Sequence, residues 1–538
     1  MNFYSTQLLA DSASSFGKFH DLLPEICLFV ATCLVMVVGL SPELRIRKLC
    51  SPLAALGLIA AGVFAARAPE SHGLLPSLLP YAKVMVAVVG LLLLLLLDGT
   101  VDRDEEHQIA SGRVLFNPLR TNRAEFYSFF LFSLTGVMLC ASADDLIWLF
   151  LALELTSLPT YIMVTISRTG RDAAKAQEAG VKYFFLGALG AATFLYGFAL
   201  LFGGTGTTKL AEIQQVFQHS GTNWIATAGL LLSLIGLGFK IAAVPMHLYT
   251  PDVYEGAAAP VSAYLAFAPK TAGFFAIILL TATVGWDPDS GNHSLPEIIR
   301  LTLWVMAALT MTVGNVLALW QNNVKRILAY SSIAHSGYML VGVIAGPGTG
   351  KSFAENGLAA VLFYLLCYAV MNLGAFAVLA CLERPDKSGH IHEVETVDDL
   401  RGLCKTHPAL GWTLVLCSLS LMGFPPLLGF LGKLPLFTSI ISAGDITLAV
   451  VLGINSAIAG FYYLRFAWAA YLQEPAPGST PANPTPYFSR PFAALISAGA
   501  VIILVFVSSL LMKHSNDAAR LASQEVPAAK RLPASSGH

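Results

Sequence analysis

The segment from 84 to 97 reads VMVAVVGLLLLLLL and contains no charged residue. A second such segment, AALISAGAVIILVFVSSLLM, occupies 493–512. A helix of about 20 apolar residues crosses the hydrocarbon core of a bilayer. Because backbone polar groups in that core must be satisfied within the protein, both segments predict membrane-spanning helices.

Composition extends this prediction to the whole chain. Of its 538 residues, 55% are hydrophobic and only 12% are charged, whereas soluble domains carry about 25% charged residues. The formal net charge of −1 argues against a nucleic-acid partner and against a polybasic surface protein. We therefore predict an all-α polytopic membrane protein whose main surroundings are the lipid bilayer.

Apolar stretches of suitable length predict about 14 transmembrane helices. They centre on 22–40, 52–66, 79–97, 126–141, 146–166, 181–202, 224–247, 260–283, 301–320, 327–344, 358–382, 410–431, 446–472 and 491–512. Lys and Arg gather in alternate connections, such as 45–48, 168–175 and 325–326. Since basic loops stay on the cytoplasmic side, this pattern predicts an N-terminus on the outer side.

Two predicted helices, the seventh and the twelfth, are broken by proline close to a lysine. Lys240 is followed by Pro245, and Pro425 and Pro426 precede Lys433. Each break falls in the fourth helix of a five-helix unit, and an odd number of helices inverts the second unit relative to the first. Inverted repeats with matching broken helices are typical of ion pathways. A purely structural kink is the alternative for either break taken alone.

The predicted helices and the two repeats divide the chain into six parts. They are the first three helices at 1–124, a first five-helix repeat at 125–283, a second inverted repeat at 300–472, a Pro-rich linker at 473–490, the last helix at 491–512 and a polar tail at 513–538.

Five ionisable residues of the predicted spans cannot easily reach water, and such buried groups are rare and usually functional: Glu154, Lys240, Lys270, His335 and Lys433. A nearby carboxylate favours the charged form of a lysine, and burial favours the neutral form. A Glu154–Lys240 pair that opens and closes would therefore make Lys240 hold and release a proton.

Each of these residues also has a structural interpretation. Glu154 can form a fixed ion pair between helices, and Lys270 can extend its side chain toward the membrane surface. His335 can be a hydrogen-bonded core histidine or a proton relay, and Lys433 can be structural. Outside this set, Lys83 is expected to extend toward the surface, like other lysines near helix ends.

Cysteine spacing gives no sign of a cofactor site. The eight cysteines are scattered singly and form no CxxC or zinc-type pattern. We expect them to be small buried hydrophobic residues, and we expect the chain itself to bind no metal or cofactor.

Five segments carry a resemblance to a known family: LLPEI, ELTSLPTYIMV, GFKIAAVPMHLYTPDVYEGAAAPVSAYLA, NVKRILAYSSIAHSGYMLVG and GFPPLLGFLGK. They resemble subunit N of bacterial proton-pumping NADH–quinone oxidoreductase, respiratory complex I, whose mitochondrial counterpart is subunit 2. The wider antiporter-like superfamily includes two sister subunits and the Mrp-type sodium/proton antiporters.

The resemblance implies a proton channel in the membrane arm of that complex, in the bacterial inner (plasma) membrane. It assigns proton-pathway positions to Glu154, Lys240, Lys270 and Lys433. NADH, FMN, the iron–sulfur clusters and quinone would belong mainly to other subunits, so this chain would carry no redox centre. Its partners would be other membrane-arm subunits, including the sister antiporter-like subunits.

One departure from the family pattern lies in the predicted eighth helix, 260–283. Pro269 directly precedes Lys270 where the family has a small residue other than proline, which puts the placement of Lys270 in question. Two other functions compete with the leading one: an Mrp-type cation/proton antiporter subunit, and a membrane scaffold whose buried charges only hold helices together.

Overall fold

The fold is taken from a computed structural model. It describes residues 20–68, 73–118, 120–286, 295–348, 352–385, 391–475 and 483–521. The N-terminus, part of the predicted linker and most of the predicted tail lie outside these ranges.

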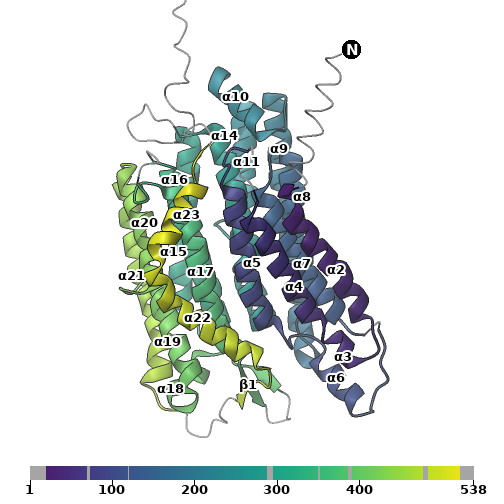
Figure 1. Ribbon diagram of the computed structural model, residues 1–538. Helices are drawn as coiled ribbons and strands as arrows, with labels where there is room; N and C mark the ends of the chain where they lie inside the picture. Colours follow the sequence, from purple (N-terminus) through teal and green to yellow (C-terminus); the bar gives the residue numbers. More distant parts are fainter. Residues whose placement is uncertain are drawn as a thin grey trace, which may run out of the picture.

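The chain is a bundle of helices with a small sheet at one end (Figure 1). The first helices are α2 (Leu23–Gly39), α3 (Leu44–Arg47), α4 (Cys50–Ala66), α5 (Leu78–Leu97) and α6 (Arg103–Ala110). The next are α7 (Arg123–Ala141), α8 (Leu146–Ile166), η1 (Gly170–Asp172), α9 (Ala173–Thr205), α10 (Leu210–Ser220), α11 (Trp224–Lys240), α12 (Thr250–Gly256), α13 (Ala259–Leu265) and α14 (Ala268–Val284).

The second half of the chain continues the bundle. Its elements are α15 (Glu297–Leu319), α16 (Val324–Ala345), α17 (Gly357–Ala380), β1 (Leu382–Pro385), β2 (Ile391–Glu393), η2 (Val397–Leu400), α18 (Leu403–Thr406), α19 (Pro408–Met422), α20 (Leu428–Ser442), α21 (Ile446–Tyr471), β3 (Asn483–Pro484), α22 (Ser489–Phe506) and α23 (Ser508–Ala518). The strands pair antiparallel in the order β2-β1-β3. We call the end of the bundle that carries this sheet, at the bottom of Figure 1, the hairpin end.

The predicted membrane fold is confirmed. Eleven helices of the described chain are long and apolar enough to cross a bilayer, and four shorter apolar helices accompany them. Three of the four, α11, α19 and α20, are short because they adjoin the two proline breaks. The exact number of crossings and the inverted repeat stay predictions.

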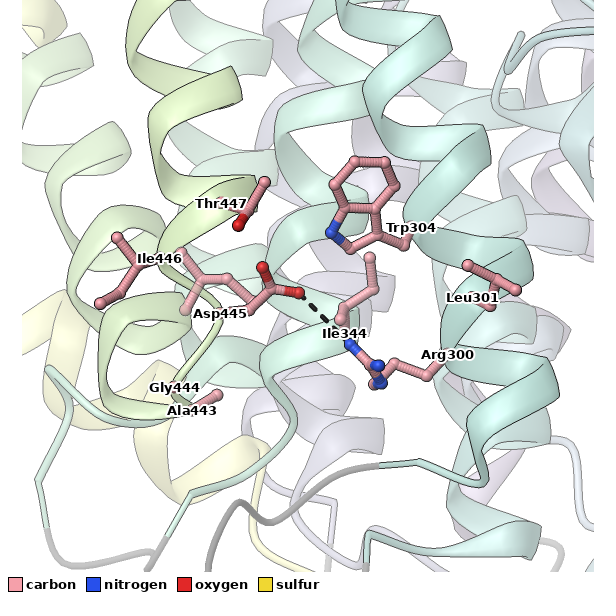
Figure 2. Close-up of a pocket in the computed structure, with 10 residues that line it drawn as sticks. Arg300, Leu301, Trp304, Ile344, Ala443, Gly444, Asp445, Ile446 and Thr447 are labelled. Atoms are coloured by element: carbon pink, nitrogen blue, oxygen red, sulfur yellow. Dashed lines mark hydrogen bonds and ion pairs between the residues drawn. The ribbon is translucent and has the colours of Figure 1, made fainter.

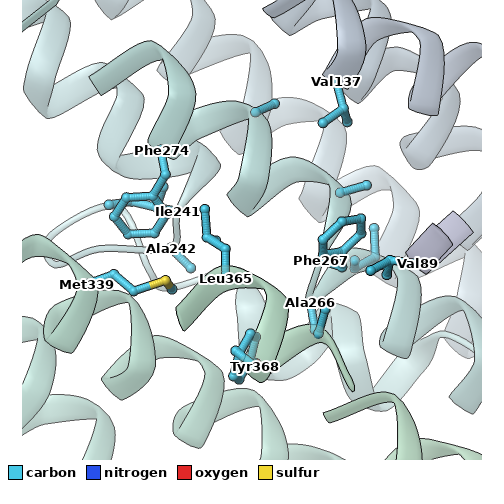
Figure 3. Close-up of a cluster of buried hydrophobic side chains, with 14 of the residues drawn as sticks. Val89, Val137, Ile241, Ala242, Ala266, Phe267, Phe274, Met339, Leu365 and Tyr368 are labelled. Carbon is cyan, nitrogen blue, oxygen red and sulfur yellow. The ribbon is translucent and has the colours of Figure 1, made fainter. Parts of the chain in front are cut away.

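Burial separates a central group of helices from an outer one. The most apolar windows of α16 and of the α13–α14 segment are 100% buried, and that of α17 is 94% buried. By contrast, α9 exposes Phe185 and α21 exposes Phe461, as expected of faces turned toward lipid. The central helices join the two halves of the chain through apolar contacts that include Ile241, Phe274 and Met339 (Figure 3).

Small residues allow α9 and α11 to pack closely in the first half of the chain. A Cβ at Gly197 of α9 would lie 2.7 Å from the carbonyl oxygen of Gly229 in α11, closer than real Cβ contacts come. Since lipid offers little hydrophobic drive for helix association, such backbone approach supplies the packing contacts. The α9–α11 contact holds in place the helix that ends at Lys240.

The first predicted break lies directly after Lys240, the last residue of α11. Ala242 adopts a left-handed conformation with φ of 57°, which stops the helix. The backbone N–H of Val244 donates to the Thr310 hydroxyl of α15 at 2.9 Å. A neighbouring helix thus satisfies a group freed by the break, as the membrane interior requires.

The second predicted break separates α19 from α20. Gly423 follows α19 with φ of 94°, and the N–H of Gly429 donates to the Ser420 hydroxyl at 3.0 Å. A Cβ at Gly423 would come within 3.2 Å of Cδ of Lys433. The break therefore leaves room for the lysine that follows it.

Pro269 has a mild effect on the fold. The predicted eighth helix is divided into α13 and α14, and Pro269 lies in the first turn of α14. Proline is well tolerated there because the first turn has no intrahelical partner for its missing N–H. Lys270 therefore lies in the first turn of a regular helix.

Candidate functional site

Lys240 and Glu154 form an ion pair in the first half of the chain. Lys240 Nζ lies 2.9 Å from Glu154 Oε1 and donates to the Ser157 hydroxyl at 2.7 Å. Both acceptors belong to α8, one turn apart, while the lysine ends α11. The side chain of Lys240 is 1% exposed and that of Glu154 is 18% exposed.

Aromatic rings close the other side of this lysine. Lys240 Nζ lies 5.5 Å from the ring centre of Phe194 and 6.0 Å from that of Phe239. A cation is attracted to such ring faces when water is excluded. The ammonium is therefore held by one carboxylate, one hydroxyl and two rings.

Lys270 is bound differently, since no carboxylate pairs with it within the described chain. It is 2% exposed, and its Nζ donates to the Ser336 hydroxyl at 2.7 Å and to the Ser332 carbonyl. Both acceptors belong to α16. These neutral groups stabilise the ammonium far less than a carboxylate does.

His335 is completely buried on α16, and both of its ring nitrogens are hydrogen-bonded. Nδ1 lies 2.6 Å from the hydroxyl of Tyr364, and Nε2 lies 3.0 Å from that of Tyr463. The partners come from α17 and α21. The interpretation as a hydrogen-bonded core histidine and the interpretation as a relay are both compatible with this geometry.

Lys433 uses the second break as its binding group. Its Nζ donates to the carbonyl oxygens of Leu421 and Met422 at 3.0 and 2.9 Å. These are among the last carbonyls of α19, where a helix end favours a cation. Nζ also lies 4.9 Å from the ring centre of Tyr338.

A further charged cluster occupies the hairpin end. Glu393 of β2 lies 3.0 Å from Lys325 Nζ and 3.3 Å from a guanidinium nitrogen of Arg168, and it accepts from the N–H of Ala259 at 3.0 Å. Burial by itself raises the pKa of Glu393, but the two cations outweigh it and lower the pKa to about 2. This carboxylate joins α16, the end of α8 and the start of α13.

The structure corrects the expectation for Lys83. Its side chain is fully buried rather than extended toward the surface, and Nζ lies 2.7 Å from Glu25 Oε1. This ion pair links α5 to α2. Helix position alone suggested exposure, but a carboxylate from another helix supplies the partner that burial requires.

A cavity of about 570 Å³ lies away from these lysines, where α15 and α16 meet the turn between α20 and α21. Arg300, Trp304 and Asp445 line it, and Arg300 approaches Asp445 to 3.4 Å (Figure 2). None of the five predicted site residues contributes to its wall. In the described ranges, no group of three or more His, Cys, Asp or Glu side chains is arranged to hold a metal ion.

Comparison with known proteins identifies the family. The family described as "NADH:quinone oxidoreductase/Mrp antiporter, TM" matches residues 143–459. NADH-quinone oxidoreductase subunit N of Trichlorobacter lovleyi is 35% identical over 515 residues, which are 94% of this chain and 97% of that protein. Subunit N 1 of Sorangium cellulosum is 40% identical over 395 residues, which are 72% of this chain and 74% of that protein.

The chain belongs to the NADH-quinone oxidoreductase subunit N family.

A solved structure supports this family assignment. A chain of respiratory complex I from Thermus thermophilus is 31% identical, has a TM-score of 0.71 and aligns with 91% of this subunit N family member and 98% of its own length. A chain of the Mrp complex from Dietzia is 21% identical with a TM-score of 0.73, over 94% of this chain and 97% of its own. The second likeness concerns the fold alone.

All five predicted site residues of this subunit N family member lie inside the matched range 143–459. The Glu25–Lys83 pair lies outside it. The tertiary structure adds partners that sequence reasoning missed, namely Ser157, Ser336, Tyr364, Tyr463 and Glu393. The segment SSIAHS carries a signal for Ser336, since it lies one turn after Ser332 on the same helix face. The segment ELTS likewise carries a signal for Ser157, one turn after Glu154. No local pattern marks Tyr364, Tyr463 or Glu393.

Proposed function

We propose that this subunit N family member is an antiporter-like proton channel in the membrane arm of NADH:quinone oxidoreductase. Protons would pass through Glu154, Lys240, Lys270, His335 and Lys433. Electron transfer from NADH to quinone in other subunits, which hold FMN and the iron–sulfur clusters, would drive the transfer.

The observation that carries this proposal is the unequal binding of three buried lysines. Lys240 has a carboxylate partner, whereas the described contacts of Lys270 and Lys433 are hydroxyl, carbonyl and ring groups. A proton-transfer chain needs sites that differ in proton affinity and can be shifted by moving one charge. Lysine amines as carriers favour protons over sodium, which prefers oxygen ligands.

The proposal includes an orientation. The hairpin end carries Arg168 and Lys325, and the excess of basic residues in the predicted inner loops supports a cytoplasmic position for this end and a periplasmic N-terminus. The two units 125–283 and 300–472 would then form the two halves of one channel, in contact with neighbouring membrane-arm subunits.

The test uses the assembled complex in inverted membrane vesicles. Lys240→Ala is expected to lower NADH-driven proton pumping at least about tenfold, because it removes a carrier. Assembly is checked by native gel, and Lys182→Ala, at a 44% exposed surface position, is the control. Normal pumping by assembled Lys240→Ala would refute the proposed function and favour a structural role for the ion pair.

A further inference from the structure

His335 differs from the buried lysines because each side of its ring meets one phenol. The ring lies between α17 and α21, with Nδ1 at 2.6 Å from the Tyr364 hydroxyl and Nε2 at 3.0 Å from the Tyr463 hydroxyl. Tyr463 in turn is hydrogen-bonded to the Ser331 hydroxyl, one turn earlier on α16 than His335. Ser331, Tyr463, His335 and Tyr364 form one unbroken row of hydrogen bonds.

The chemistry of the row gives it a direction that can be reversed. A neutral imidazole donates from one nitrogen and accepts at the other, while a phenol both donates and accepts. When Tyr364 donates to Nδ1, the Nε2–H donates to Tyr463, which donates to Ser331. In the other tautomer every bond in the row points the opposite way.

We propose that Ser331, Tyr463, His335 and Tyr364 form a proton wire that serves the Lys433 side of the channel. A proton arriving at the Tyr364 oxygen displaces the phenol proton to Nδ1. Nε2–H then passes its proton to Tyr463, Tyr463 passes its own to Ser331, and Ser331 releases its hydroxyl proton at the end of the row. One proton enters and one leaves, every group ends neutral, and the imidazole has changed tautomer. Transfer from Ser331 to Tyr364 runs by the same steps in reverse.

Packing places Tyr364, at one end of the row, beside the helix that carries Lys433. A Cβ at Gly432, next to Lys433, would lie only 2.6 Å from Cδ2 of Tyr364, so the Tyr364 ring lies directly on the backbone of α20. Lys270 instead uses Ser336 and the Ser332 carbonyl. Although Ser336 is next to His335 in the sequence, both imidazole nitrogens are occupied by the phenols.

The row gives His335 a more specific role than the proposed function requires. The proposed function needs the histidine only as a polar residue of the pathway, whereas the hydrogen bonds place it in line with Tyr463 and Tyr364. This inference rests on the proposed function, because a proton wire has a use only if the chain moves protons. It adds Tyr364, Tyr463 and Ser331 to the pathway.

The test removes single hydroxyls and keeps the rings. Tyr364→Phe and Tyr463→Phe are made in the full complex, and NADH-driven proton pumping is measured in inverted vesicles at equal amounts of assembled complex. Each variant interrupts the row, so pumping is expected to fall about tenfold or more.

Two other buried tyrosines provide matched controls. The Tyr368 ring packs 4.9 Å from the His335 ring, but its hydroxyl makes no hydrogen bond to the imidazole within the described chain. Tyr81 of α5 donates to the Leu362 carbonyl of α17 at 3.2 Å, so Tyr81→Phe loses a hydrogen bond outside the row. Both Phe variants are expected to pump within about twofold of the parent, because neither hydroxyl belongs to the wire.

The possible results distinguish a failure of the proton wire from a failure of the proposed function. If Tyr364→Phe and Tyr463→Phe pump like the two controls while Lys433→Ala is inactive, the wire is refuted and the proposed function stands. If Lys433→Ala and Lys240→Ala also pump normally, the proposed function itself fails. Where a Phe variant does not assemble, 3-fluorotyrosine at the same position keeps the hydroxyl and acidifies it. The pH profile of pumping should then shift, and an unchanged profile refutes the wire.

Discussion

Lys240 Nζ lies 2.9 Å from Glu154 Oε1 although 86 residues separate the two positions in the chain. The pair joins α11 to α8 at the point where α11 breaks. Removing one member of a buried pair leaves an uncompensated charge, whereas removing both does not. This asymmetry allows the structural and the transport roles of the pair to be measured separately.

The first prediction uses that asymmetry. Glu154→Gln should lower the free energy of unfolding by about 3 kcal/mol, because Lys240 stays buried without a counter-charge. The double variant Glu154→Gln with Lys240→Met should recover most of this loss but none of the proton pumping. Thermal unfolding of the purified subunit or complex and vesicle pumping are the two measurements. A double variant that regains both would assign the pair a structural role only.

The second prediction concerns Lys270, which the proposal requires to release its proton. Lys270→Arg keeps the positive charge but introduces a group that stays protonated in proteins. Pumping should therefore be lost even when the complex assembles. Lys182→Arg, on the exposed surface of α9, is the control and should pump normally. Full pumping by Lys270→Arg would show that proton release from this position is not needed.

The third prediction follows from the low pKa of Glu393 at the hairpin end. Because its folded pKa of about 2 lies below the ordinary glutamate value of 4.5, the ionised carboxylate stabilises the fold. This stabilisation is complete above about pH 5 and is lost as the pH falls through about 4.5 toward about 2.

Glu393→Gln should thus cost on the order of 2 kcal/mol of unfolding free energy at neutral pH and much less near pH 3. Thermal melts across this pH range measure the difference. Glu395→Gln is the matched control, since its contacts with Arg168 and Lys175 are longer, at 3.8 and 3.7 Å. An equal loss at both pH values would mean that the charge of Glu393 is not what stabilises the hairpin end.

The fourth prediction tests the contact between α20 and α17. Gly432→Ala places a methyl group 2.6 Å from Cδ2 of Tyr364, so either α20 or the tyrosine must move. Overpacking of this kind costs about 1–3 kcal/mol. Gly453→Ala, where the nearest atom is 3.6 Å away, should be neutral or stabilise α21 by up to about 1 kcal/mol, because alanine favours a helix more than glycine does. Equal melting temperatures for the two variants would contradict the close packing.

Much of the fold follows from local patterns. The length of apolar segments such as 84–97 is enough to predict membrane-spanning helices. In lipid, the backbone N–H and C=O groups of such a segment can form hydrogen bonds only within their own helix. Both predicted breaks occur next to the expected lysines, since proline acts on its own turn. Lys83 shows the limit of such reasoning. Because it lies near a helix end, it was predicted to reach the membrane surface, but it is buried and paired with the Glu25 carboxylate of another helix.

The sequence by itself determined the membrane class, the family and the positions of the five ionisable residues, because these depend on composition, on motifs and on residues close together in the chain. Only the tertiary structure decided what each residue touches. Tyr364 and Tyr463 reach His335 from helices 29 and 128 residues away, and Glu393 meets Lys325 across 68 residues. Such partners are chosen by the packing of whole helices, which no local pattern of the chain encodes.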